Sequence, residues 1–143
     1  MTNVDIGKLF SLHPNIVGLC RKSLLNKGYL VKDTEDKRIH YLTDKLSGIE
    51  LPIINGKKDS RECIVPFEIY NNPNLKTGSK LLWGEYNTMS KTENGYYSKR
   101  ETNSKRMNVS DGSITNWTKE LFANEFLEVY EVKSGYITKN KKL

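Results

Sequence analysis

The sequence predicts an α+β fold, mainly α with small β-hairpins, arranged as two small units. The first observation is an internal repeat, because residues 12–30 can be laid over residues 109–127 without a gap, and in both copies a polar turn precedes apolar residues at helical spacing. The second is the hydrophobic run that follows each copy and leads into a candidate strand. The third is size: 143 residues with 36% apolar content can hold one ordinary domain or two small ones.

Two helices are predicted to open the first unit, which we assign to residues 1–47. Thr2 or Asn3 can cap a short helix whose apolar face carries Ile6, Leu9 and Phe10. After a turn at residues 11–13, Pro14 suits the first position of a second helix, and Gly28 suits a left-handed C-terminal cap. The buried stripe of this second helix is expected to consist of Val17, Leu19, Cys20, Leu24 and Leu25.

A hairpin is predicted to follow, with strands at residues 29–32 and 38–43 around the charged turn 33–37. A helix-turn-helix with a hairpin behind it has the order of a winged helix, in which the second helix is the recognition helix and the hairpin is the wing. The remaining face of that helix carries small or donor-bearing residues that can approach base edges and phosphates, namely Asn15, Gly18, Arg21, Lys22 and Asn26.

Residues 3–45 carry a moderately specific motif that consists of Asn26-Lys27-Gly28-Tyr29-Leu30-Val31, Asp36-Lys37-Arg38 and Leu42-Thr43-Asp44-Lys45. This pattern resembles the MarR-type winged helix, in which an Asp-x-Arg wing ends in a Leu-Thr strand. The resemblance implies that Arg38 reaches into the minor groove and that Asp36 orients it.

Residues 48–63 are predicted to form a linker, because glycine, proline and charged residues outnumber apolar anchors there. The second unit is assigned to residues 64–143. Its first helix is expected between a cap at Thr77 or Ser79 and Met89, and Ser98 is expected to cap a helix that ends near Met107. The second copy of the repeat then supplies another recognition helix, and a closing hairpin is predicted over residues 127–139 with its turn at 134–135.

Residues 64–130 carry a second set of motifs: Val65-Pro66-Phe67, Lys80-Leu81-Leu82-Trp83-Gly84-Glu85-Tyr86, Asn94-Gly95-Tyr96, Val109-Ser110, Ile114-Thr115-Asn116-Trp117 and Lys119-Glu120-Leu121. This stretch resembles the N-terminal winged helix of phage replisome organisers, whose relatives open plasmid replication initiators. Of the activities of the replisome organisers, the resemblance implies only the binding of duplex DNA.

Further polar and basic residues of the second unit are candidates for DNA contact, with a solvated surface as the alternative. The exposed face of its recognition helix is expected to carry Ser113, Thr115, Asn116, Thr118 and Lys119. A basic cluster that flanks this helix is placed for phosphates and consists of Lys99, Arg100, Lys105 and Arg106, while Lys133 lies on the second wing. Trp83, Trp117 and the pair Tyr96-Tyr97 could stack on single-stranded nucleic acid, although core packing is the commoner role of such tryptophans.

Charge and composition exclude several function classes. The formal net charge of +6 and the pI near 9.2 favour a polyanionic partner. We expect a cytoplasmic protein without a membrane segment, because no apolar run of about 18 residues occurs. Cys20 and Cys63 show no metal-ligand spacing, and neither a nucleophile with a base nor a phosphate-cradling glycine motif stands in a suitable context. Neither an enzyme nor a cofactor or metal is therefore expected.

These observations together predict sequence-specific binding of double-stranded DNA by two winged helices, in replication initiation of a phage, plasmid or other mobile element. A MarR-like transcriptional repressor is the alternative that the first unit favours. A third hypothesis is a winged-helix interaction protein that inhibits a host or nucleic-acid-processing enzyme. Single-stranded DNA, a homodimer, or a replication or transcription protein are further partners that the sequence leaves open.

Overall fold

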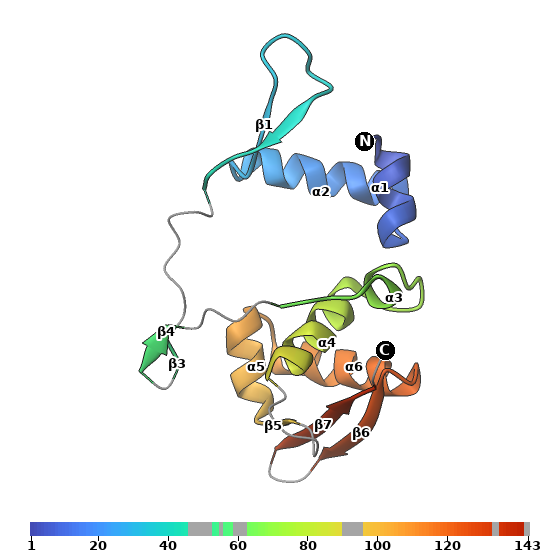
Figure 1. Ribbon diagram of the computed structural model, residues 1–143, viewed down its shortest axis with the longest axis vertical. Helices are drawn as coiled ribbons and strands as arrows, with labels where there is room; N and C mark the ends of the chain where they lie inside the picture. The colour runs from blue at the N-terminus through green and yellow to red at the C-terminus, as the bar shows by residue number, and fades with distance from the viewer. Residues whose placement is uncertain (46–52, 55, 59–62, 90–95, 133–134, 142–143) are drawn as a thin grey trace. The chain divides into compact units, whose positions relative to one another are not determined.

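The chain folds into two compact units, Met1–Ser60 and Arg61–Leu143. The computed structural model describes residues 1–45, 53–54, 56–58, 63–89, 96–132 and 135–141 (Figure 1). Within these residues the chain forms six helices and small antiparallel sheets, which confirms the predicted α+β class. Most of the predicted linker 48–63 lies outside the described residues.

The described residues of unit 1 form two helices and two short hairpins. Thr2 caps α1 (Asn3–Phe10) in a capping box with Asp5, as the sequence predicts, because the Thr2 hydroxyl accepts from the Asp5 N–H and the Asp5 carboxylate accepts from the Thr2 N–H. Helix α2 (Pro14–Asn26) begins at Pro14, and Gly28 follows it with the expected positive φ of 80°. β1 (Leu30–Lys32) pairs with β2 (His40–Leu42), and β3 (Ile53–Ile54) pairs with β4 (Lys57–Lys58).

In the part of unit 2 that the structure describes, the chain forms four helices and one three-stranded sheet. Its helices are α3 (Phe67–Tyr70), α4 (Thr77–Met89), α5 (Arg100–Met107) and α6 (Asp111–Ala123). Its strands are β5 (Tyr96–Ser98), β6 (Leu127–Val132) and β7 (Tyr136–Asn140), and β7 lies in the centre of the antiparallel order β5–β7–β6. The predicted hairpin is present, although its turn residues 133–134 lie outside the described residues.

Ser98 does not cap α5, contrary to the sequence prediction. The residue at the cap is Lys99, which makes no side-chain capping bond. Ser98 instead ends strand β5, where its buried hydroxyl accepts a hydrogen bond of 2.7 Å from the Asn103 amide. The pairing of β5 with β7 places Ser98 opposite Tyr136, so a long-range strand contact decides its position.

The internal repeat is present in the structure as the same elements at a constant offset. The starting residues 3, 14 and 30 of α1, α2 and β1 correspond to the starting residues 100, 111 and 127 of α5, α6 and β6, which is 97 positions in each pair. The turn between the helices is also the same, because Ser11 and Asn108 both have a left-handed backbone, with φ of 53° and 55°. The two units therefore share a helix-turn-helix followed by a strand.

The hydrophobic core lies in unit 2. Leu82, Tyr86, Ile114 and Leu121 are completely buried there and belong to one cluster that joins α4, α6 and the sheet. In the described part of unit 1, Val17 is the one buried large apolar side chain. The prediction that Leu19, Cys20 and Leu24 are buried is wrong: all three are exposed, because no described helix of unit 1 covers that face of α2 as α4 covers α6.

Candidate nucleic-acid interface

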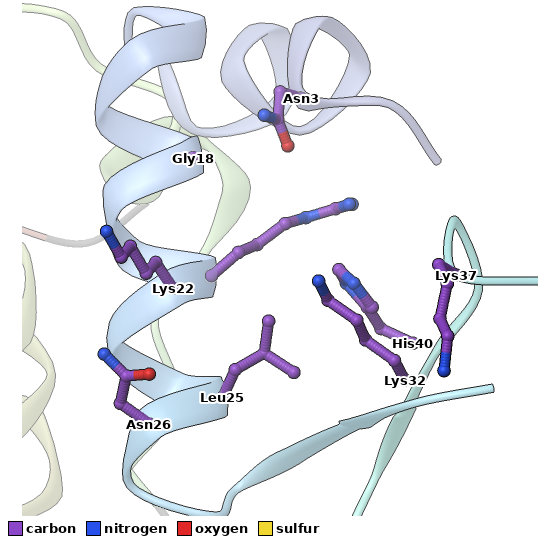
Figure 2. A pocket seen from close by; sticks show the side chains of 9 residues that line it. Asn3, Gly18, Lys22, Leu25, Asn26, Lys32, Lys37 and His40 are labelled. Carbon is purple, nitrogen blue, oxygen red and sulfur yellow. The ribbon is translucent and has the colours of Figure 1, made fainter. Parts of the chain in front are cut away.

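A cationic concave surface of unit 1 lies between α2 and the β1–β2 hairpin (Figure 2). We call it the helix–hairpin cleft, and its volume is about 630 Å³. α1 supplies one lining residue, α2 five and the hairpin three. The cleft is lined by Asn3, Gly18, Arg21, Lys22, Leu25, Asn26, Lys32, Lys37 and His40.

The local folding of each element explains why these residues meet. The α2 residues lie three or four positions apart, which places them on one face of the helix. Across the hairpin, Lys32 is the register partner of His40, so both side chains stand on the same face of the sheet. Figure 2 shows Leu25 pointing from α2 toward these two side chains. Gly18 lies close to Asn3, because a Cβ atom at position 18 would lie 3.3 Å from the Asn3 amide nitrogen.

The electrostatics of the helix–hairpin cleft favour an anion. Arg21, Lys22, Lys32 and Lys37 are cationic, and none of the described lining residues is an Asp or Glu. The Nδ1 atom of His40 is buried and has no hydrogen-bond partner among the described residues. Arg21 is held in place by a 2.8 Å hydrogen bond that its guanidinium donates to the Met1 carbonyl. Several phosphates along a backbone would match this concentration of positive charge.

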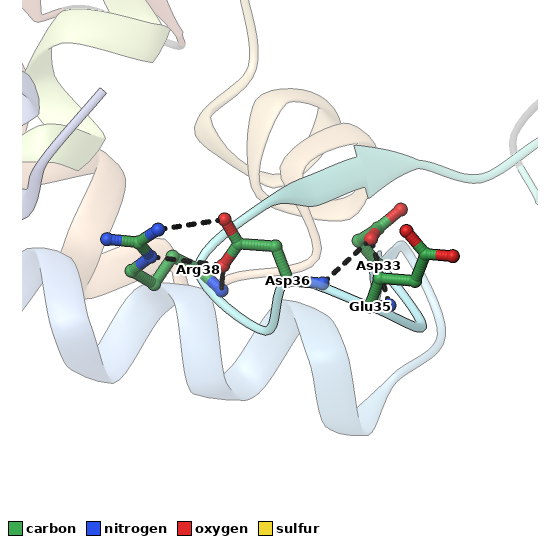
Figure 3. Close-up of polar contacts among 4 residues, drawn as sticks. All are labelled: Asp33, Glu35, Asp36 and Arg38. Carbon is green, nitrogen blue, oxygen red and sulfur yellow. Dashed lines mark hydrogen bonds and ion pairs between the residues drawn. The ribbon is translucent and has the colours of Figure 1, made fainter.

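The tip of the hairpin is ordered by two carboxylates (Figure 3). Asp33 accepts hydrogen bonds from the backbone N–H groups of Glu35 at 3.0 Å and Asp36 at 2.9 Å. Asp36 in turn accepts two bonds of 3.0 Å from the Arg38 guanidinium. These bonds lower the pKa of both aspartates, while the Asp36 carboxylate raises the pKa of Arg38.

The Arg38 guanidinium is thus paired with the Asp36 carboxylate, while its contact with a minor groove stays a prediction. Its side chain is 90% exposed, and it lies outside the lining of the helix–hairpin cleft. Asn15 also lies outside that lining, at the exposed first turn of α2, where its backbone N–H is donated to the His13 ring. Of the six residues predicted in unit 1, five on α2 and Arg38 on the hairpin, the cleft thus brings together Gly18, Arg21, Lys22 and Asn26.

The corresponding surface of unit 2 is formed by α6 and the residues before it. Asn116 and Lys119 are exposed on α6, and Ser113 lies in its first turn with its N–H bonded to the capping Ser110 hydroxyl. Thr115 accepts a 3.0 Å hydrogen bond from the Arg100 guanidinium, and its hydroxyl lies 2.7 Å from the Tyr136 hydroxyl. Thr115 is therefore part of an internal network.

Thr118 is fully buried, so the prediction that it is exposed on this face is wrong. Its hydroxyl lies 2.8 Å from the Tyr86 hydroxyl and donates to the Ile114 carbonyl. The physical reason is helical spacing: Ile114, Thr118 and Leu121 form one stripe that packs on α4.

The basic cluster of unit 2 is divided among different environments. Lys99 and Arg100 are exposed beside a cavity of about 330 Å³, whose lining also includes Glu101 and Asp111. Lys105 is exposed and forms a 2.8 Å ion pair with Glu101. Arg106 is partly buried and bonded to Glu85, so its guanidinium serves an internal ion pair. Lys133 lies outside the described residues.

Sequence reasoning missed Lys32, Lys37, His40 and Asn3 as lining residues of the helix–hairpin cleft. The predicted hairpin could have indicated Lys32 and His40, because residues paired across two strands share a face of the sheet. Their pairing depends on the seven-residue connection between Lys32 and His40, which is longer than the five-residue turn that the sequence suggests.

No family model, curated protein or solved structure matches the chain. None of the described helices combines the length and the apolar character that a membrane span requires.

Proposed function

We propose that this chain binds double-stranded DNA and that the helix–hairpin cleft of unit 1 holds the DNA backbone. The observation that carries this proposal is the convergence of Arg21, Lys22, Lys32 and Lys37 from two elements onto one concave surface whose described lining contains no carboxylate. Phosphate contacts by Lys and Arg supply the main, sequence-independent part of DNA affinity.

The order of elements supports an assignment of both units as winged helices. In unit 2, three helices and a hairpin occur in the order α4, α5, α6, β6, β7, and β5 pairs with the second hairpin strand. In unit 1, α1, α2, β1 and β2 follow the same order as α5, α6, β6 and β7 of unit 2. On this assignment α2 and α6 are the recognition helices, and the hairpins behind them are wings that approach the adjacent backbone or minor groove.

The two kinds of contact have different roles in this proposal. Lys32 and Lys37 on the hairpin position the duplex through its phosphates, whereas Arg21 and Asn26 on α2 can donate to base edges in the major groove. Arg38, which does not line the cleft, adds a further contact between the hairpin and the DNA. Unit 2 adds a less cationic surface through Asn116, Lys119 and the exposed Lys99 and Arg100.

The two recognition helices present different residues, so we infer that the target is an asymmetric or direct-repeat site. The resemblance of residues 64–130 to phage replisome organisers favours replication initiation of a mobile element as the cellular role. Unit 1 alone would equally suit a repressor, and both roles begin with duplex binding.

Fluorescence anisotropy with a labelled random duplex and its single strand tests this function. We expect the duplex to bind more tightly and its affinity to fall steeply between about 50 and 200 mM salt. The Arg21→Ala/Lys22→Ala variant should reduce the slope of log K against log salt by about 2, whereas Lys8→Ala, which removes a cation outside the cleft, should leave it unchanged. Circular dichroism of each variant shows that its helices are retained. Absence of duplex binding at low salt, or an unchanged slope in the double variant, would overturn the proposal.

A further inference from the structure

A second concave surface of unit 1 is mainly apolar and lies along the neighbouring face of α2. We call it the apolar groove, and its volume is about 620 Å³. Its floor follows Val17, Cys20 and Leu24 on α2, and its walls include Ile6 of α1 and Ile39 and Leu42 of the hairpin. Leu42 is 85% exposed and Leu24 is 40% exposed, so the groove presents apolar side chains to solvent.

The internal repeat shows what fills the equivalent groove in unit 2. At the offset of 97 residues, Leu24 corresponds to Leu121, which is completely buried. The element that covers Leu121 is helix α4, which packs along α6 and shares its hydrophobic cluster. The same helix-turn-helix therefore has a covering helix in unit 2 and none in the described part of unit 1. By this correspondence, a helix is the element expected to cover the open groove.

One difference between the two copies of the repeat indicates the chemistry of a helix that would cover the apolar groove. In unit 2, Thr118 faces α4, and its hydroxyl meets the hydroxyl of Tyr86. The corresponding residue of unit 1 is Arg21, which lines the apolar groove as well as the helix–hairpin cleft. None of the described residues that line the groove is an Asp or Glu. A helix that covers Arg21 would bury a cation that is bonded to the neutral Met1 carbonyl, and a carboxylate on that helix would neutralise its charge.

A second copy of this chain does not fit that requirement. Its α4 is committed to its own core, where Leu82 and Tyr86 are completely buried. Docking two grooves against each other would bring like charges together, since residues 1–45 contain eight Lys and Arg against five Asp and Glu.

We propose that the apolar groove binds an amphipathic helix of a partner protein, with apolar residues at positions i, i+3, i+4 and i+7 and an acidic residue that faces Arg21. Such a helix would cover α2 in unit 1 as α4 covers α6 in unit 2. Arg21 and His40 line both surfaces, but the other lining residues differ, so variants of Leu42 and Ile39 test this inference separately from DNA binding.

A peptide-binding assay with the full chain tests this inference. The probe is a labelled, helix-stapled peptide of about 15 residues with leucine at those positions and glutamate on both flanks. The matched control peptide has lysine in place of every glutamate. We expect saturable binding of the acidic peptide and at least tenfold weaker binding of the basic one. The Arg21→Gln variant should lose most of this discrimination.

Variants of the groove wall locate the binding site. Leu42→Ser and Ile39→Ser should each weaken the acidic peptide by about tenfold or more, which corresponds to the loss of one apolar anchor. Val31→Ser, which replaces another exposed apolar side chain of the same hairpin outside the lining, should leave binding unchanged. Because the Leu42 side chain is largely exposed, its replacement should change peptide binding without unfolding the unit. Failure of both peptides to bind, or equal binding of the two, would overturn the inference. So would self-association that Leu42→Ser abolishes, because that result would assign the groove to a second copy.

Discussion

Lys32 and Lys37 form the proposed contact between the hairpin and the DNA backbone. We expect Lys32→Ala and Lys37→Ala each to weaken duplex binding at every sequence and to reduce the salt slope by about 1, because each removes one phosphate contact. Lys8→Ala serves as the matched control, since Lys8 lies on α1 of the same unit and does not line the helix–hairpin cleft. Salt titrations followed by anisotropy measure these slopes. Equal slopes for Lys32→Ala, Lys37→Ala and Lys8→Ala would place the duplex elsewhere.

Asp33 and Asp36 make the hairpin tip sensitive to acid. Hydrogen bonds from backbone N–H groups and from Arg38 lower the pKa of both carboxyl groups below the usual value of 3.8. A lowered pKa in the folded state means that the ordering of the tip is complete above about pH 5 and is lost as the pH falls through the lowered pKa values. NMR shifts of the Glu35 amide and the Arg38 Nε–H group should therefore titrate with midpoints below 3.8. Midpoints at or above that value would show that these bonds do not form.

Single residues of the site differ in how far the sequence defines them. Arg21, Lys22 and Asn26 could be predicted because helical spacing alone places them on one face of α2. Lys32 and His40 could not, because their pairing depends on the length of the hairpin connection. Arg106 looked equivalent to Lys105 in the sequence, yet Glu85, which is far away along the chain, binds its guanidinium.

Helices α4 and α6 approach closely where Gly78 meets Trp117. A Cβ atom at position 78 would lie 2.1 Å from the Trp117 ring, so Gly78→Ala must push the two helices apart. We expect a loss of about 1–3 kcal/mol in the free energy of unfolding of unit 2, as is usual for overpacking. Urea denaturation followed by tryptophan fluorescence measures this unit, because Trp83 and Trp117 are the two tryptophans of the chain.

Gly112→Ala is the matched control for that experiment. Gly112 lies in the first turn of α6, where the nearest atom to an added Cβ would be 3.8 Å away. Alanine should therefore be neutral or stabilise by about 0.5 kcal/mol through reduced freedom of the unfolded chain. If Gly78→Ala were as well tolerated as Gly112→Ala, the close packing of α4 on α6 would be wrong.

The bounds of the longer elements could be predicted from local signals. Thr2, Pro14 and Gly28 mark helix ends through caps and backbone preferences that operate within a few residues. Strand β5 could not be predicted in this way. It has only three residues, and its position is decided by pairing with β7, which is about 40 residues away in the sequence.

At the scale of the whole molecule, the two units differ in how much apolar surface they bury. The sequence gives both copies of the repeat a similar apolar stripe, but a covering helix is present on that stripe only in unit 2 among the described residues. We therefore expect α2 to open more readily than α6, by about 2 kcal/mol, which is the value of burying one leucine side chain. Native-state hydrogen exchange by NMR compares the amides of Leu24 and Leu121 directly. Equal protection of these two amides would contradict the difference in burial.

Mapping of the duplex onto the chain by NMR tests the central claim most directly. Stoichiometric addition of a random DNA duplex to the isotope-labelled full chain should shift the amides of residues 18–26 and 32–40, and more weakly those at the start of α6. The amides of the buried helix α4 should not move. Shifts that avoid the helix–hairpin cleft, or a spectrum that the duplex leaves unchanged at low salt, would contradict the proposal that this chain is a DNA-binding protein.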